Sequence, residues 1–142
     1  MKVTLFLFLS VVMLTLVVVC CIGQKSPELE GTLWKLDSYV NLQGDMVKVM
    51  PDTEITAQFK DGTVNGSSGC NSYFGSYTIS GTAITFGPIG MTEMYCAEPE
   101  GIMEQENGYL AALQSVEGFT INGNKLEMTN AQGTLILVYV AA

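Results

Sequence analysis

Residues 66–77, GSSGCNSYFGSY, contain four serines, three glycines and two tyrosines around Cys70. Serine and glycine are typical of a tight turn, and the side chain of Asn71 can cap such a turn. No Gly-Lys-Ser/Thr follows, so the segment is not a phosphate-binding P-loop. The tyrosines come after the turn with the alternation of a β-strand. That alternation predicts two faces, with Tyr73, Tyr77 and Ile79 on one and Cys70 and Phe74 on the other.

A second landmark, TEMYC at residues 92–96, ends in Cys96. Cys70 and Cys96 are the only cysteines after the N-terminal apolar run. The N-terminal segment, described in the next paragraph, predicts that this part of the chain lies outside the cytoplasm, where disulfides persist. We therefore predict a structural disulfide between Cys70 and Cys96. Closing a loop of about 26 residues contributes roughly 3–4 kcal/mol in the chain-entropy model. A redox-active pair is the alternative, but the spacing is not C-x-x-C and acidic residues flank Cys96, which disfavours a reactive thiolate.

The N-terminal segment, residues 1–22, is apolar from Val3 onward except for one serine and two threonines. Such a run is long enough to cross a bilayer as a helix, so it predicts a signal peptide or a membrane anchor. Cys20 and Cys21 resemble the end of a lipobox and are candidate lipidation sites, although no small residue precedes them. Lys2 favours a cytoplasmic N-terminus. We therefore expect a membrane-anchored, extracytoplasmic protein, in the periplasm or on the cell surface.

The composition excludes several classes of function. The chain has 14 acidic residues, six Lys or Arg and no histidine, for a net charge of −8. Without histidine there is no Ser-His-Asp or Cys-His nucleophile and no imidazole metal site. A domain this acidic does not suit nucleic acid, because phosphate binding needs a basic face. The prediction is a protein that is not an enzyme and has no cofactor.

The chain divides into a polar linker at residues 23–30 and one domain at residues 31–142, which reads mostly as strands. In residues 31–40, alternation places Trp34, Leu36 and Val40 on one face. Residues 134–140, TLILVYV, are apolar on both faces, which predicts a central strand. Four turn pairs indicate hairpins: Asp61-Gly62, Ser80-Gly81, Asn122-Gly123 and Gln132-Gly133.

One segment, Pro99–Val116, predicts a helix. Ile102, Tyr109 and Leu113 fall near helical spacing, and Pro99 suits a first helical turn. The expected fold class is therefore mainly β (α+β): a compact antiparallel sheet or partial barrel crossed by one α-helix.

An acidic run and a set of aromatic residues raise two further possibilities. Hard oxygen ligands suit Ca²⁺, but no D-x-D-x-D-G loop is present, and glutamates also favour a helix N-terminus. We therefore predict no metal site and keep calcium as an alternative. Aromatic side chains can line a ligand groove, but in a small β domain they also form the core. The acidic residues are Glu93, Glu98, Glu100, Glu104 and Glu106, and the aromatic ones are Tyr73, Phe74, Tyr77, Tyr95 and Tyr109.

The ordered landmarks resemble the META domain family of HslJ-like, heat-inducible lipoproteins. They are GTLWKLDSY (31–39), ITAQF (55–59), DGTVNGSSGCNSYFGSY (61–77), MTEMYC (91–96), EQENGYLAAL (104–113) and FTINGNKLEM (119–128). The resemblance covers Leu29 to Val140. It implies an antiparallel sheet or partial barrel with one helix, an envelope location, a link to stress tolerance and no known catalytic activity. The matching motif residues, implied to be structural, are Gly69, Cys70, Asn71, Tyr73, Gly75, Tyr77 and Cys96.

The resulting prediction is a non-enzymatic, membrane-tethered, HslJ-like binding module in envelope maintenance or stress tolerance. Its expected partners are the membrane, through the N-terminal anchor or a lipid, and a protein or small ligand. Two alternatives remain open: a thiol–disulfide oxidoreductase that uses Cys70 and Cys96, and a Ca²⁺-binding surface domain that uses the Glu93–Glu106 segment.

Overall fold

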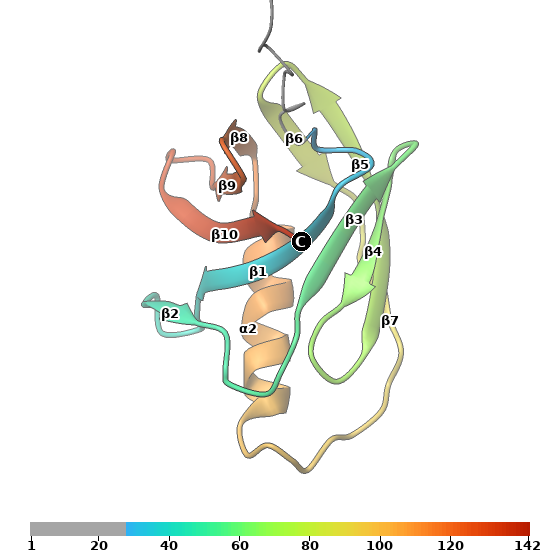
Figure 1. Cartoon of the computed structure of the whole chain (residues 1–142), viewed down its shortest axis with the longest axis vertical. Helices are drawn as coiled ribbons and strands as arrows, with labels where there is room; N and C mark the ends of the chain where they lie inside the picture. Colours follow the sequence, from blue (N-terminus) through green and yellow to red (C-terminus); the bar gives the residue numbers. More distant parts are fainter. Residues whose placement is uncertain (1–27) are drawn as a thin grey trace, which may run out of the picture.

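In the computed structural model, residues 28–142 are described, and they form ten strands and one helix (Figure 1). The predicted signal or anchor segment at residues 1–22 lies outside the described residues, as do Cys20, Cys21 and the first part of the predicted linker. The elements are β1 (Leu33–Val40), β2 (Met46–Lys48), β3 (Thr56–Lys60), β4 (Thr63–Ser67), β5 (Ser72–Ser80), β6 (Ala83–Phe86), β7 (Gly90–Met91), α2 (Ile102–Gln114), β8 (Gly118–Asn122), β9 (Lys125–Thr129) and β10 (Leu135–Ala141).

Eight of the strands close into an antiparallel barrel. Their order is β1-β3-β4-β5-β6-β8-β9-β10, and β10 pairs back onto β1. The two short strands extend this barrel, β2 along β1 and β7 along β5. The sequence predicts a sheet or partial barrel with a helix; the structure is a closed barrel, in which each of the eight strands has a partner on both sides. Closure removes the unpaired strand edges that an open sheet exposes.

The predicted hairpins are all present. Asp61 and Gly62, with φ of 49° and 76°, connect β3 to β4 in left-handed conformations that a tight primed turn requires. The other three turn pairs connect β5 to β6, β8 to β9 and β9 to β10. The segment TLILVYV lies between β9 and β1, as its apolar pattern predicts.

A β-bulge at Asp37 changes which side chains of β1 face the core. Leu36 pairs with Tyr139 and Ser38 with Val138, so Asp37 has no partner of its own. The inward alternation therefore shifts by one residue. Tyr39 is buried, whereas Val40, which the sequence pattern places inward, is only half-buried. Lys48 donates to Asp37 Oδ1 and Oδ2 over 2.8 and 2.6 Å, and this hydrogen bond lowers the pKa of Asp37.

Helix α2 is shorter than the sequence predicts, at Ile102–Gln114. Pro99 precedes the helix instead of lying in its first turn, and its carbonyl accepts the N–H of Ile102 over 3.1 Å. In Figure 1 the helix lies behind β1 and crosses it. Gly108 permits close contact there, because an added Cβ would lie 3.0 Å from Tyr39 Cε2.

The core fills the barrel and the space beneath the helix. Trp34 is fully buried, and its indole N–H donates to the carbonyl of Leu29 over 3.0 Å. Phe59 packs edge-on against Tyr77, with ring centroids 5.3 Å apart. Leu29 is itself 7% exposed and therefore packs on the barrel, although it falls within the predicted linker. No helix in residues 28–142 has the length and apolar character needed to span a bilayer.

Candidate functional site

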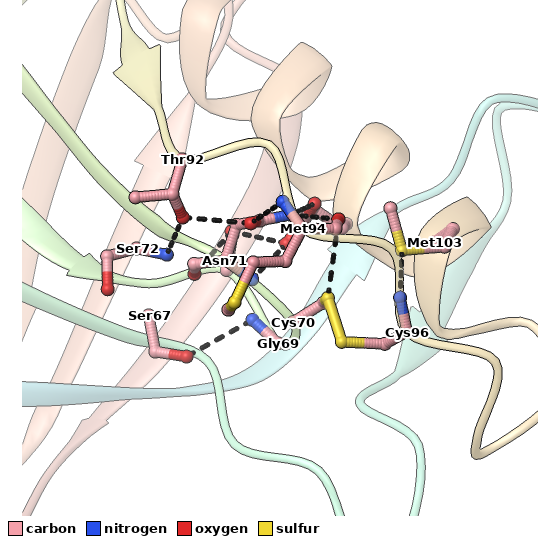
Figure 2. The surroundings of a disulfide bond; sticks show 11 residues. Ser67, Gly69, Cys70, Asn71, Ser72, Thr92, Met94, Cys96 and Met103 are labelled. Atoms are coloured by element: carbon pink, nitrogen blue, oxygen red, sulfur yellow. Dashed lines mark hydrogen bonds between the residues drawn. A yellow bond between two sulfur atoms is a disulfide. The ribbon is translucent and has the colours of Figure 1, made fainter.

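The predicted Cys70–Cys96 disulfide is present and joins the turn before β5 to the loop after β7 (Figure 2). The two Cα atoms lie 5.9 Å apart, and both residues are half-buried. The N–H of Cys96 points at the sulfur of Met103 on α2, 3.5 Å away. The loop that carries Cys96 therefore contacts both the barrel and the helix.

Asn71 joins the same two segments a second time. Its Oδ1 accepts the N–H of Met94 and the hydroxyl of Thr92, each over 2.8 Å. Its Nδ2 donates to the carbonyl of Met94 over 3.1 Å. The amide reproduces the paired donor and acceptor of a β-ladder, so it holds the loop through hydrogen bonds beside the covalent link (Figure 2).

Glu106 of α2 is fully buried beneath this turn. Its Oε2 accepts the N–H of Asn71 over 2.7 Å and the hydroxyl of Ser68 over 2.6 Å, while Oε1 accepts Nδ2 of Asn71 over 2.7 Å. A buried carboxyl is tolerated only when it is well hydrogen-bonded. Glu106 therefore fixes the turn onto the helix, a role that the helical pattern did not predict.

Two glycines shape the turn. Gly69 has a φ of +114°, a conformation that residues with a Cβ rarely adopt. Gly66 lies where β4 passes very close to β3, since an added Cβ would be 1.9 Å from the carbonyl oxygen of Thr56. Gly75, a third glycine of the motif, is half-buried in β5 beside Ile89. The glycine-rich composition of this segment thus serves close backbone packing.

Three tyrosine hydroxyls form a buried chain between β5, α2 and β10. Tyr73 donates to the carbonyl of Thr56 over 2.9 Å, and its oxygen lies 2.7 Å from that of Tyr109. Tyr109 in turn lies 2.9 Å from the hydroxyl of Tyr139. Burial raises the pKa of all three hydroxyls above the ordinary value. The chain keeps these polar atoms paired where the helix packs against the barrel.

Tyr77, the other motif tyrosine, is buried farther along β5. Its hydroxyl donates to Glu30 Oε1. Burial, together with the adjacent Glu30 carboxylate, raises the pKa of Tyr77 to about 12. Glu30 also pairs with Phe59, so the segment before β1 is attached to the barrel by backbone and side chain.

The structure does not gather the acidic run. Glu106 is buried with both oxygens occupied, whereas Glu93, Glu98, Glu100 and Glu104 are exposed. Within residues 28–142, no three Cys, His, Asp or Glu side chains are placed to hold one metal ion. Glu104 does lie in the first turn of α2, where the helix dipole favours an acid.

The aromatic residues divide between core and surface. Tyr73, Tyr77 and Tyr109 are at most 5% exposed, so they cannot line a surface groove. Phe74 and Tyr95 are 61% and 82% exposed. As the alternation predicts, Tyr73 and Tyr77 share the inner face of β5 and Phe74 faces out; Ile79, which the pattern places with the two tyrosines, is exposed near the end of the strand.

The sequence profile of the META domain matches residues 27–142. The chain belongs to the META domain family. No curated protein matches it. The profile covers the disulfide, the Asn71–Glu106 contact and the tyrosine chain, so these contacts all lie within the META domain of this chain.

Solved structures share the fold of this META domain. A protein from Burkholderia xenovorans, determined by NMR, is 27% identical, with a TM-score of 0.64 over 80% of this chain and 83% of that one. A DUF4847 family protein from Bacteroides vulgatus is 16% identical, with a TM-score of 0.54 over 79% and 93% of the two chains. At this lower identity the similarity concerns the fold alone.

Taken together, the motif residues of this META domain form a rigid support beneath an exposed loop. Two further residues contribute that were not singled out from the sequence, Gly66 and Tyr139, and Glu106 contributes in a role other than the one considered for the acidic run. The sequence does contain a signal for the burial of Glu106. This residue precedes Tyr109 by three positions and Leu110 by four, so it lies on the apolar side of the helical pattern.

Proposed function

We propose that this chain is a membrane-tethered, extracytoplasmic META domain of the HslJ-like type that acts by binding and not by catalysis. The apolar segment at residues 1–22 supplies the tether, either as an uncleaved anchor or as a signal cleaved before a lipidated Cys20 or Cys21. The proposed role lies in envelope maintenance or stress tolerance. The motif residues support this proposal, because GCN-x-Y-F-G-x-Y and T-x-M-x-C both occur within the matched domain.

The observation that carries the binding role is a set of exposed apolar side chains on β5 and on the loop that the support described above holds. The set is Phe74, Met94 and Tyr95, which are 61%, 58% and 82% exposed. Met94 is held by its backbone to Asn71, and Tyr95 lies between Met94 and the disulfide. Large apolar side chains at a fixed position favour recognition, since little conformational entropy is lost when a partner covers them.

Site-specific photo-crosslinking tests the binding role in the native cell. A benzophenone side chain replaces Tyr95 in the full-length chain, and Thr85, exposed on β6, is the matched control position. We expect a discrete crosslinked product from position 95 and none from position 85. Equal products from both positions, or no product from position 95, would contradict a binding surface around Tyr95.

The tether is tested separately. We expect the full chain to fractionate with membranes and its C-terminal domain to be digested by protease added to spheroplasts, in which any outer membrane has been opened and the cytoplasmic membrane is intact. Intact mass spectrometry of the mature protein then separates the two anchors, because lipidation adds acyl mass at Cys20 or Cys21. Recovery of the domain in the cytoplasmic fraction would refute the proposed location without affecting the crosslinking result.

A further inference from the structure

A cleft of about 300 Å³ lies between the N-terminal half of α2 and the hairpin formed by β1 and β2. Tyr39 and Asn41 line it from the hairpin, Glu104 and Gln105 from the helix, and Met50 from the segment after β2. Beyond Asn41 and Leu42, a second hollow of about 250 Å³ is mostly apolar. None of the motif residues at the disulfide lines either hollow.

Tyr39 presents a hydroxyl without a partner. The residue is only 5% exposed, and its hydroxyl makes no hydrogen bond within residues 28–142. In the same part of the chain, every fully buried side-chain oxygen and nitrogen has a partner. The hydroxyl of Tyr39 therefore reaches the open space of the cleft, where a ligand can meet it.

Glu104 supplies the charge of the cleft. It is exposed and forms no ion pair within residues 28–142, where the ion pairs are Lys35–Glu54 and Lys48–Asp37. Glu104 and Tyr39 line the same cleft, and burial, followed by the negative charge of Glu104, raises the pKa of Tyr39. No basic side chain lines the cleft.

Two of the other polar groups of the cleft, Asn41 Oδ1 and the amide of Gln105, already have hydrogen-bond partners, whereas Asn41 Nδ2 and the exposed amide of Gln43 have none within residues 28–142. Asn41 Oδ1 accepts the N–H groups of Gln43 and Asp45. Gln105 accepts the N–H of Met50 over 2.7 Å and donates to Thr53 over 3.0 Å. Among the side chains that line the cleft, Glu104 is therefore the charged group, and Tyr39 is the buried residue whose polar atom has no partner within residues 28–142.

This pair of groups suits a hydrogen-bond donor with positive charge. A hydroxyl oxygen and a carboxylate both accept N–H bonds, and charge-assisted bonds of this kind are the stronger ones. The net charge of −8 opposes an anion. A bare Ca²⁺ ion needs 6–8 oxygen ligands, more than these two residues offer.

We propose that the cleft binds an alkylammonium group, with its N–H donors on Glu104 and Tyr39 and its carbon chain along Met50 and Leu42. Both a free aliphatic amine and the lysine side chain of a peptide carry this group. The proposal does not depend on the Tyr95 surface, since it uses different residues.

Titration of the isotope-labelled full-length chain in detergent micelles, followed by NMR, tests the site. The probes are n-hexylammonium chloride and the tripeptide Ala-Lys-Ala with blocked ends, with n-hexanol as the uncharged control. We expect saturable shifts of backbone amides at residues 39–43 and 101–105 with at least one charged probe. A response to hexylammonium alone identifies a free amine as the source, and a response to the peptide alone identifies a lysine side chain.

Three variants make the test specific. Glu104→Gln should weaken binding by about tenfold or more, because it removes a charge-assisted hydrogen bond. Tyr39→Phe should weaken binding by several-fold. Glu117→Gln removes the same charge from an exposed acid beyond the C-terminal end of α2 and should leave binding unchanged. Native-like spectra of the barrel strands confirm that each variant is folded.

Four results would overturn the proposal: no shifts from either charged probe, equal binding by hexanol, unchanged affinity in Glu104→Gln, or equal weakening in Glu117→Gln. The last of these would mean that the amine responds to overall charge and not to the cleft. None of these results bears on crosslinking at Tyr95, so the two proposals fail independently.

Discussion

Glu106 accepts both N–H groups that Asn71 directs toward α2, one from the backbone and one from the side chain, each over 2.7 Å. The two residues are 35 positions apart, and the carboxyl group is fully buried. The favourable contacts offset the cost of burying a carboxylate only while every partner is a donor. Exchanging donors and acceptors one at a time therefore tests the relationship without changing side-chain size.

Asn71→Asp should be strongly destabilising, by about 3 kcal/mol or more. The substitution places a second carboxylate oxygen where Nδ2 lies, 2.7 Å from Glu106 Oε1. The free energy of unfolding from urea denaturation measures the loss. Asn107→Asp, on an exposed position of the same helix, is the control and should have little effect.

The double variant Asn71→Asp with Glu106→Gln should be more stable than Asn71→Asp alone. In the double variant the Gln amide donates to the new carboxylate, and its oxygen still accepts the N–H of residue 71. Rescue is partial, since the Met94 carbonyl loses its donor. Additive losses in the cycle would show that the two side chains do not interact as described.

Replacing Cys70 and Cys96 with Ser should lower the free energy of unfolding by roughly 3 kcal/mol while the loop keeps its native position. Asn71 holds Met94 independently of the disulfide, so the ordered state survives reduction. Urea denaturation measures the loss, and amide shifts of residues 92–96 report the position. Unchanged stability together with measurable insulin reduction by the wild type would favour the thiol–disulfide oxidoreductase alternative instead.

The tyrosine chain has a direction. Tyr73 gives its one proton to Thr56, so Tyr109 donates to Tyr73 and Tyr139 donates to Tyr109. Tyr139→Phe removes only the last hydroxyl of the three and should lower the free energy of unfolding by about 1 kcal/mol. Tyr73→Phe leaves a buried hydroxyl proton without an acceptor and should cost about 2–3 kcal/mol. Equal losses in the two variants, measured by urea denaturation, would argue against this order.

Alkaline pH should destabilise the fold through Tyr77. The pKa of Tyr77 is about 12 in the folded state against 10.0 in the unfolded chain. The contribution of Tyr77 to the free energy of unfolding is therefore fully present below pH 10. Between about pH 10 and 12 the unfolded chain loses the proton first, and the free energy of unfolding falls by about 2–3 kcal/mol. Urea denaturation across this range should show a smaller decline in Tyr77→Phe. An identical decline in both proteins would assign the effect to other groups.

Local features of the fold are predictable from the sequence, whereas contacts between distant segments are not. The predictions of the Asp61-Gly62 turn and of the three other hairpin turns are confirmed, because turn geometry depends on adjacent residues. The bulge at Asp37 is missed, and with it the burial of Tyr39, because it depends on the register against β10. Barrel closure depends on the same pairing and is not visible in the alternation of either strand.

The candidate site likewise has parts that the sequence predicts and parts that it does not. The disulfide is predictable because Cys70 and Cys96 are the only cysteines after residue 22. The contacts of Glu106 are not, because its position on the apolar side of the helical pattern does not reveal its hydrogen-bond partners, and those partners lie in the turn before β5. The aromatic set was also ambiguous, since exposure depends on which face of the strand the barrel encloses.

The pairing of β1 with β10 also sets the order of events during biosynthesis. The chain emerges in the N-to-C direction, whether from a ribosome or through a translocation pore. Trp34 and Leu36 of β1 therefore emerge about one hundred residues before β10, the strand with which they pair. The barrel cannot close until residues 135–141 are free, so one edge of β1 stays unpaired and accessible to chaperones until the final strand has emerged.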